Sequence, residues 1–155
     1  MIQEDFEMSI MGEMNFFLGL QVRQSREGMF VHQEKYRKQI HKKFGFENSK
    51  GSNTLMNPST RLDADSTVKK VSDKLYRSVI GSLLYLNAYR LDILYNVCVC
   101  ARFQIEPNET HLATVKQTFK YFPSTSKLGI GYPKNQNIDL IGYFDTDYAG
   151  CRIDR

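Results

Sequence analysis

Tryptophan is absent from this sequence of 155 residues, and cysteine and proline are scarce, with three and four copies. Three cysteines are too few for a disulfide framework, and Cys98 and Cys100 lack the second ligand pair that a zinc site requires. No apolar run approaches the roughly 20 residues that span a bilayer, and residues 1–9 lack the basic-then-apolar order of a signal peptide. The sequence therefore predicts an intracellular protein, cytoplasmic or nuclear, without a membrane partner.

Net charge is also small. The 21 Lys and Arg residues exceed the 17 Asp and Glu residues by only 4, which is too mild to establish a nucleic-acid partner. The basic residues are nevertheless clustered, because eight of them lie between Arg23 and Lys50 against three acids. Ten Phe, nine Tyr and a hydrophobic content of 41% are sufficient for one ordinary core. We therefore expect a folded chain with a locally basic region.

Residues 1–47 form the first predicted unit, which begins with a β-hairpin. Residues 14–22 are largely apolar, a turn signal follows at Glu27 and Gly28, and residues 29–31 are apolar again. Two short apolar runs separated by a turn signal indicate two antiparallel strands.

A basic helix is predicted to follow between residues 33 and 44. Tyr36, Ile40 and Phe44 recur every four residues and are interpreted as core contacts, and Gly45 occupies the helix-ending position. The remaining helix surface carries five basic residues, which are Lys35, Arg37, Lys38, Lys42 and Lys43. This surface either lies along a phosphate backbone or is the solvated face of a surface helix.

Two further units follow along the chain. Residues 48–71 are rich in Ser, Thr, Asn, Asp and Lys and contain Pro58, which is typical of an exposed connector with little structure of its own. Residues 72–127 carry three apolar segments with helical spacing and are predicted to form a packed helical cluster. Ser72 or Asp73 is the predicted cap of the first helix.

The second and third helices of this cluster have their own start signals. Asp92 is the predicted cap of the second helix, which is apolar on nearly every side. We therefore expect both Cys98 and Cys100 to be buried there as small hydrophobic residues. The third helix is predicted to begin at Glu106 and Pro107, where the missing N–H of proline is harmless.

The last part of the chain, residues 128–155, is predicted to open a second sheet. Short strands are indicated at residues 128–132 and 138–144, and no helix or further strand follows them. Because two strands alone are only marginally stable, we expect the reading frame to stop inside a domain. The fold class predicted for the whole chain is α+β.

Six segments occur in an order that resembles the end of a copia-type retrotransposon Pol polyprotein. They are residues 11–20 (MGEMNFFLGL), 76–86 (YRSVIGSLLYL), 90–93 (RLDI), 101–103 (ARF), the pair Pro107 and His111, and residues 142–150 (GYFDTDYAG). Order and spacing both match over essentially the whole chain. Departures include Leu91, where that family usually has proline, and Pro123, in a helix end that usually reads Leu-Lys-Gly. Such departures are typical of a copy that is no longer under selection for function.

The resemblance implies roles for several parts of the chain. Phe17, Leu18 and Gly19 would lie in the palm-edge hairpin of a reverse transcriptase, which holds the primer terminus. Residues 72–127 would form thumb and connection helices that grip the template–primer duplex, and residues 128–155 would begin ribonuclease H. The implied partner is therefore an RNA–DNA or DNA duplex, contacted by this hairpin and by the basic helix.

Asp145 would be, by the same resemblance, the first carboxylate ligand for Mg²⁺ in ribonuclease H, whereas Asp139 and Asp147 are interpreted as polar strand positions. Nucleotidyl transfer requires two divalent metals held by several carboxylates. The Tyr-x-Asp-Asp turn that supplies them in the polymerase palm does not occur in the sequence. The palm and fingers of the parent are expected to be missing, so the fragment alone is predicted to hold no cofactor and to polymerise no DNA.

The sequence leaves three functions open. The first is a fragment of an RNA-directed DNA polymerase with ribonuclease H that keeps at most duplex affinity. The second is a non-catalytic nucleic-acid-binding or regulatory protein derived from such a fragment, and the third is an independent helical interaction domain with an accidental likeness. No histidine is predicted to be catalytic, because His32, His41 and His111 are dispersed along the sequence. His111 is expected to make a structural hydrogen bond.

Overall fold

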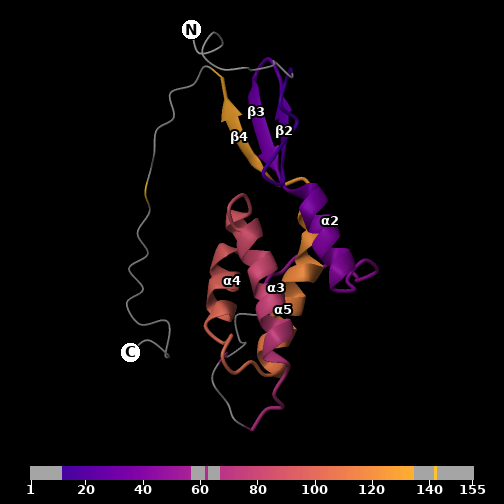
Figure 1. Ribbon diagram of the computed structural model, residues 1–155, viewed down its shortest axis with the longest axis vertical. Coiled ribbons are helices and arrows are strands. Elements are labelled where there is room, and N and C mark those ends of the chain that lie inside the picture. The colour runs from indigo at the N-terminus through magenta and orange to yellow at the C-terminus, as the bar shows by residue number, and fades with distance from the viewer. Residues whose placement is uncertain (1–11, 57–61, 63–66, 135–141, 143–155) are drawn as a thin grey trace, which may run out of the picture.

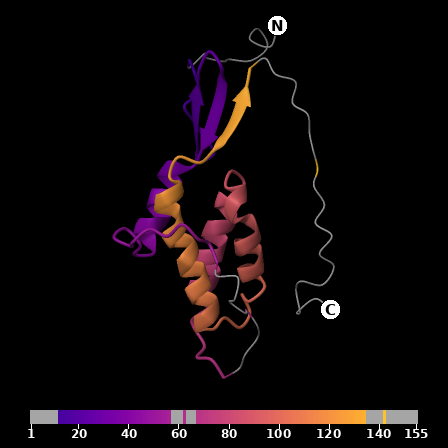
Figure 2. The same ribbon diagram turned by 180° about the vertical axis from the view of Figure 1, so that it is seen from behind.

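The computed structural model describes residues 12–56, 62, 67–134 and 142, with a sheet at one end of the molecule and helices at the other (Figure 1). The sheet is antiparallel, in the order β1-β2-β3-β4. Its strands are β1 (Phe16–Phe17), β2 (Leu20–Gln24), β3 (Gly28–His32) and β4 (Ile130–Pro133). The helices are α2 (Glu34–Lys43), α3 (Asp73–Leu86), α4 (Leu94–Ala101) and α5 (Glu109–Tyr121), with 3₁₀ segments η1 (Leu91–Ile93) and η2 (Phe122–Thr125). The predicted α+β class is confirmed, and Figure 2 shows from behind how α5 leads back toward the sheet.

The predicted N-terminal hairpin is formed by β2 and β3. The Ser25 backbone N–H donates to the Gly28 carbonyl over 2.8 Å and closes the turn between the two strands. The apolar run expected to form one strand is divided, because β1 ends at Phe17 and β2 begins at Leu20. A continuous apolar run does not reveal such a break, which depends on backbone conformation.

β4 belongs to the same sheet as the hairpin. Ile130 is paired with Val31 of β3, and a Cβ on Gly129 would lie 2.5 Å from the Val31 carbonyl oxygen, so glycine allows the close approach. The strand predicted at residues 128–132 therefore joins the N-terminal sheet, which differs from the separate sheet that we expected. The free edge of β3 accepts it, and a local sequence pattern does not identify that partner. The other predicted strand, residues 138–144, lies outside the described residues apart from one position.

α2 is the predicted basic helix, and it ends as expected. Gly45 has φ of +74°, its N–H donates to the Lys42 carbonyl over 3.2 Å, and the Phe46 N–H donates to the His41 carbonyl over 2.8 Å. These two bonds are those of a Schellman ending, which requires a left-handed residue after the helix. Ile40, on the predicted apolar stripe, is buried. The sequence-based prediction of this helix is confirmed.

α3 begins at the predicted cap, but the segment before α4 differs. The Ser72 hydroxyl oxygen accepts a hydrogen bond from the Leu75 backbone N–H over 3.3 Å. The Asp92 carboxylate instead accepts two hydrogen bonds from the Arg90 guanidinium, over 2.8 and 2.7 Å. The expected cap at Asp92 is therefore wrong, because a buried arginine occupies its carboxylate and the chain makes the η1 turn before α4 begins.

α4 is buried on one side only. Val97 and Cys100 are buried, whereas Tyr95 is 71% exposed and Cys98 is also exposed. The expectations of a helix buried on nearly every side, and of a buried Cys98, are therefore wrong. Burial raises the pKa of the Cys100 thiol to about 12, so this cysteine stays protonated and contributes packing rather than reactivity.

α5 begins at Glu109 rather than at the predicted Glu106 and Pro107. The Asn108 side-chain oxygen accepts from the His111 backbone N–H over 3.1 Å, and His111 Nδ1 accepts from the Asn108 backbone N–H over 3.1 Å. This reciprocal capping box is a stronger start signal than the preceding proline. It also confirms the predicted structural hydrogen bond of His111.

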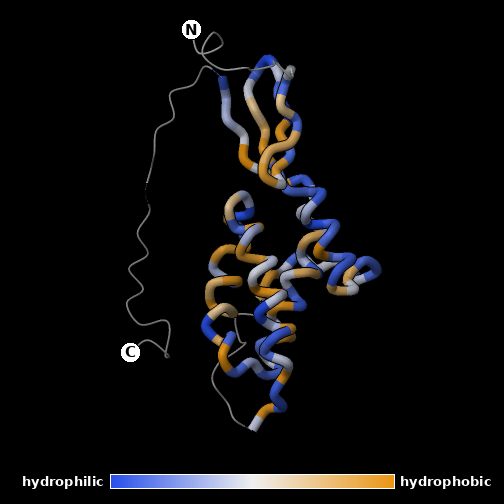
Figure 3. The backbone as a smooth tube through the Cα atoms, in the orientation of Figure 1, coloured by the Kyte–Doolittle hydropathy of each residue, from blue (hydrophilic) through white to orange (hydrophobic). Residues whose placement is uncertain are grey.

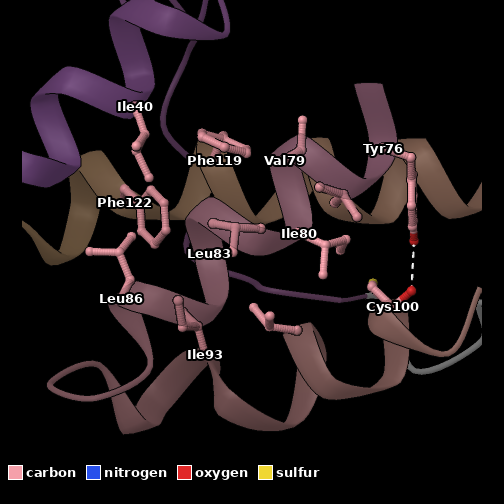
Figure 4. Close-up of a cluster of buried hydrophobic side chains, with 12 residues drawn as sticks. Ile40, Tyr76, Val79, Ile80, Leu83, Leu86, Ile93, Cys100, Phe119 and Phe122 are labelled. Carbon is pink, nitrogen blue, oxygen red and sulfur yellow. Dashed lines mark hydrogen bonds between the residues drawn. The ribbon is translucent and has the colours of Figure 1, made fainter. Parts of the chain in front are cut away.

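The helices enclose one hydrophobic core, shown in Figure 4. Its buried members are Ile40, Tyr76, Val79, Ile80, Leu83, Leu86, Ile93, Val97, Cys100, Val115, Phe119 and Phe122. The Tyr76 hydroxyl donates to the Cys100 carbonyl over 2.9 Å, so the polar atom of the buried ring has a partner. Figure 3 shows α2 as mostly hydrophilic and α4 as mostly hydrophobic. Among the described helices, none has the length and apolar content needed to cross a membrane.

Where the structure describes it, the connector at residues 48–71 forms no helix or strand, but part of it is hydrogen-bonded to α5. The Ser52 backbone N–H donates to the Lys120 carbonyl over 2.7 Å. The Gln117 side-chain amide donates to the Ser52 hydroxyl over 2.7 Å. α5 therefore supplies polar partners that the local composition of the connector does not indicate.

The stability of the fold is expected to fall in mildly acidic solution because of His41. Its ring lies among Phe46, Phe119 and Phe122, and burial, followed by the charge of Arg37, lowers the pKa of His41 below its ordinary value of 6.5. A pKa that is lower in the folded state gives stability that is present above the unfolded value and is lost as pH falls through the folded value. The free energy of unfolding should therefore decrease as pH falls below about 6.5.

Urea unfolding at a series of pH values measures this effect. The variant His41→Leu removes the titrating ring and should show a shallower loss of stability with acid than the unmodified chain. An identical pH dependence in the two proteins would contradict the assignment to His41.

Candidate nucleic-acid interface

α2 presents three exposed lysines on one side. Lys35, Lys38 and Lys42 are all exposed, and at about 100° per residue they fall within a sector of about 60°. With a rise of about 1.5 Å per residue, this row is about 10 Å long. We call these three residues the lysine stripe. A row of ammonium groups suits a polyanion better than a single small anion, because each can neutralise a separate phosphate.

Lys43 lies away from the stripe and faces α3. Its ammonium group lies 4.9 Å from the centroid of the Phe44 ring and donates to the Ser78 hydroxyl over 3.4 Å. The predicted basic surface is therefore divided, with Lys43 on the α3 side.

Arg37 is only 8% exposed, so its predicted place on the basic surface is wrong. It lines a small cavity with Gln33, Leu86 and Arg90. Burial lowers the pKa of Arg37, and Glu34 opposes that effect. The side of α2 that carries Arg37 faces Leu86, at the end of α3, and Arg90, where the long aliphatic stem of arginine can pack. This placement removes Arg37 from the surface available to phosphates.

The turn between β1 and β2 exposes three apolar side chains. Phe16, Phe17 and Leu18 are 51%, 50% and 74% exposed. Leu18 and Gly19 have φ values of 47° and 81° between the paired residues Phe17 and Leu20. Positive φ at both central residues is typical of a type I′ hairpin turn. For Leu18 the left-handed conformation costs roughly 1–2 kcal/mol, so the fold holds this turn against a local preference.

The structure brings this turn beside the lysine stripe. We call residues 16–19 the aromatic turn. The Lys35 ammonium group lies 5.1 Å from the centroid of the Phe16 ring, and the Lys35 backbone N–H donates to the Gln21 side-chain oxygen over 2.7 Å. The sequence-predicted residues Phe17, Leu18 and Gly19 therefore lie close to the first residue of the stripe.

Two residues of this interface were not predicted. Phe16 contacts Lys35 directly, and the Tyr85 hydroxyl of α3 donates to the Leu18 carbonyl. The neighbouring aromatic pair at positions 16 and 17 is a sequence signal for Phe16. Tyr85 has no such signal, because it lies within a broadly apolar helix whose other side forms the core.

The charge of the stripe is partly balanced by an acid on the same helix. The Glu34 carboxylate lies 2.6 Å from the Lys38 ammonium group, and this hydrogen bond lowers the pKa of Glu34. Exposed pairs of this kind contribute little to stability and are easily exchanged. Lys38 therefore remains available to a phosphate that competes with Glu34.

The predicted metal ligand Asp145 lies outside the described residues, as do Asp139 and Asp147. Within the part of the chain that the structure describes, no group of three or more His, Cys, Asp or Glu side chains could hold a metal ion. The described residues therefore do not supply ligands for the Mg²⁺ pair that the resemblance implies.

Fold and surface together define an α+β protein whose candidate site is a basic and aromatic surface at the junction of sheet and helices. The chain is 30% identical over 154 residues to an uncharacterized mitochondrial protein of Arabidopsis thaliana, an alignment that covers 99% of the chain and 64% of that protein. It is 30% identical over 153 residues to the retrovirus-related Pol polyprotein from transposon RE1 of the same plant, covering 99% of the chain and 10% of the polyprotein. The corresponding values for transposon RE2 are 26% over 149 residues, with 96% and 10% covered.

The chain is homologous to the retrovirus-related Pol polyproteins of transposons, which confirms the resemblance in its sequence. An accidental likeness is thereby excluded. The chain spans less than two thirds of the mitochondrial relative and a tenth of each polyprotein. No protein-family model matches the chain, and no solved structure matches it.

Proposed function

We propose that this chain corresponds to the part of a copia-type reverse transcriptase that runs from the palm-edge hairpin through the thumb and connection helices. In this proposal the chain binds an RNA–DNA or DNA duplex through the lysine stripe and the aromatic turn. The observation that carries the proposal is the contact between Lys35 and Phe16, which brings the two surfaces together. Lysines neutralise phosphates, and exposed aromatic rings stack on bases at the end of a duplex or on an unpaired strand.

The proposed role is to hold nucleic acid rather than to polymerise it. Nucleotidyl transfer requires carboxylates that hold two metal ions, and this sequence contains no Tyr-x-Asp-Asp turn. In a longer parent protein, the interface would position a duplex for carboxylates that other parts of that protein supply. An incubation with primed RNA template, nucleotides and Mg²⁺ should give no primer extension, and extension by the purified chain would contradict this part of the proposal.

Salt dependence of binding tests the proposed interface. The affinity for a 20-base-pair duplex, either RNA–DNA or DNA, should fall linearly with salt on logarithmic axes between about 50 and 200 mM. If the three lysines each contact one phosphate of B-form DNA, the slope should be about −2.7. Binding should depend little on base sequence, because phosphate contacts carry no sequence information. A flat response to salt, or no binding at about 50 mM, would refute the nucleic-acid function.

A further inference from the structure

Tyr85 connects the helical cluster to the aromatic turn. Its hydroxyl donates to the Leu18 carbonyl, the carbonyl of the residue with the strained conformation. A Cβ on Gly19 would collide with the Tyr85 hydroxyl, so the contact depends on glycine at that position. Leu18 and Gly19, both far from Tyr85 in the sequence, thus contact the same hydroxyl group.

The same tyrosine is tied to α2, which carries the lysine stripe. The ring of Tyr36 packs edge-on against Tyr85 with centroids 4.6 Å apart. The Tyr36 hydroxyl donates to the Ser82 carbonyl over 3.3 Å, and the Gln33 side-chain amide donates to the Tyr85 carbonyl over 3.2 Å. Tyr85 therefore has contacts with both halves of the interface, the turn on the sheet and the helix with the lysines.

We infer that Tyr85 is a positioning residue, which holds the aromatic turn at a set place beside the lysine stripe so that one duplex contacts both. This inference rests on the proposed function for its effect on binding. The sheet packs on the helices mainly through β2 and α2, so the hydrogen bond to the Leu18 carbonyl is a further point of attachment, made from α3. Without the hydroxyl, the aromatic turn is held to the helices by its contact with Lys35 and becomes more mobile, and a ligand must order it on binding.

The variant Tyr85→Phe tests the inference, because it removes one oxygen and keeps the ring that packs on Tyr36. The matched control is Tyr95→Phe, which removes the same atom from an exposed ring on α4. In the free protein, amide hydrogen exchange should become faster for Val22, whose N–H donates to the Asn15 carbonyl at the base of the turn. Exchange in α3 and α5 should not change, and the control variant should behave like the unmodified chain.

Duplex binding supplies the second readout. Tyr85→Phe should weaken binding about fivefold, the effect of one lost hydrogen bond, without changing the slope against salt, because no phosphate contact is removed. In the unmodified chain, the effects of Phe17→Ala and Lys42→Gln on duplex affinity should be coupled. In the Tyr85→Phe background, the loss of affinity in the double variant should equal the product of the two single losses.

The outcomes separate the inference from the proposed function. Faster exchange at Val22 with weaker binding and lost coupling supports both. Faster exchange in a chain that binds no duplex supports the attachment of the turn and refutes the proposed function. Unchanged exchange overturns the inference whatever the affinity, and so does equal coupling in the two backgrounds.

Discussion

Replacing Lys35, Lys38 and Lys42 together by glutamine is expected to weaken duplex binding on the order of a hundredfold at about 0.1 M salt. Each lysine that contacts a phosphate releases counterions, so removing three contacts should also make the salt slope shallower by about 2.7 on B-form DNA. Glutamine keeps most of the side-chain length and a good helix propensity, so α2 should remain folded. Fluorescence anisotropy with a labelled duplex over a range of salt concentrations measures both quantities.

The matched control removes three positive charges elsewhere. Lys69, Lys74 and Lys116 are exposed and lie outside α2 and the aromatic turn. Their joint replacement by glutamine changes the net charge by the same amount and should alter affinity much less. An equal loss in the two triple variants would show that binding follows net charge alone, and it would contradict a localised interface.

Replacing Phe119 by alanine is expected to destabilise the fold by about 3–5 kcal/mol. The ring is fully buried, stacks on Phe46 with centroids 4.6 Å apart, and packs edge-on against Phe44 and Phe122 at 5.7 Å each. It already borders an apolar cavity of about 130 Å³, which the substitution would enlarge. Larger cavities cost more, because surrounding side chains lose contacts that nothing replaces. Urea unfolding followed by circular dichroism measures the change.

Ile105 provides the control for this loss. It is 87% exposed, so Ile105→Ala should change the free energy of unfolding by less than about 0.5 kcal/mol. A cost below about 1 kcal/mol for Phe119→Ala would mean that its ring does not pack into the core shown in Figure 4.

Features set by neighbours along the chain were predicted correctly. The turn before Gly28, the Gly45 ending of α2 and the Ser72 cap of α3 each depend on a few consecutive residues. The helical spacing of apolar residues that predicts α3 and α5 is also a local property. These predictions agree with the structure because backbone geometry and capping act within one or two turns.

Features set by distant partners were not predictable in this way. Asp92 looks like a cap, but its carboxylate binds the Arg90 guanidinium, which also donates to the Thr125 hydroxyl, 35 residues further along the chain. Arg37 looks exposed until α2 packs with that side inward. The strand with which β4 pairs, and the exposure of Tyr95 on α4, likewise depend on which elements pack together. Each of these differences reflects a tertiary contact that competes with a local preference.

The features of the candidate interface fall into the same two groups. The sequence by itself determined the basic helix, the apolar turn at Phe17 to Gly19 and the relation to transposon Pol polyproteins, because residue spacing and motif order are properties of the chain. Only the tertiary structure decided that Lys35 meets Phe16, that Arg37 is withdrawn from the surface and that Tyr85 reaches the Leu18 carbonyl. The physical reason is that these contacts join residues from separate elements, and their geometry is set by how the sheet, α2 and α3 pack together.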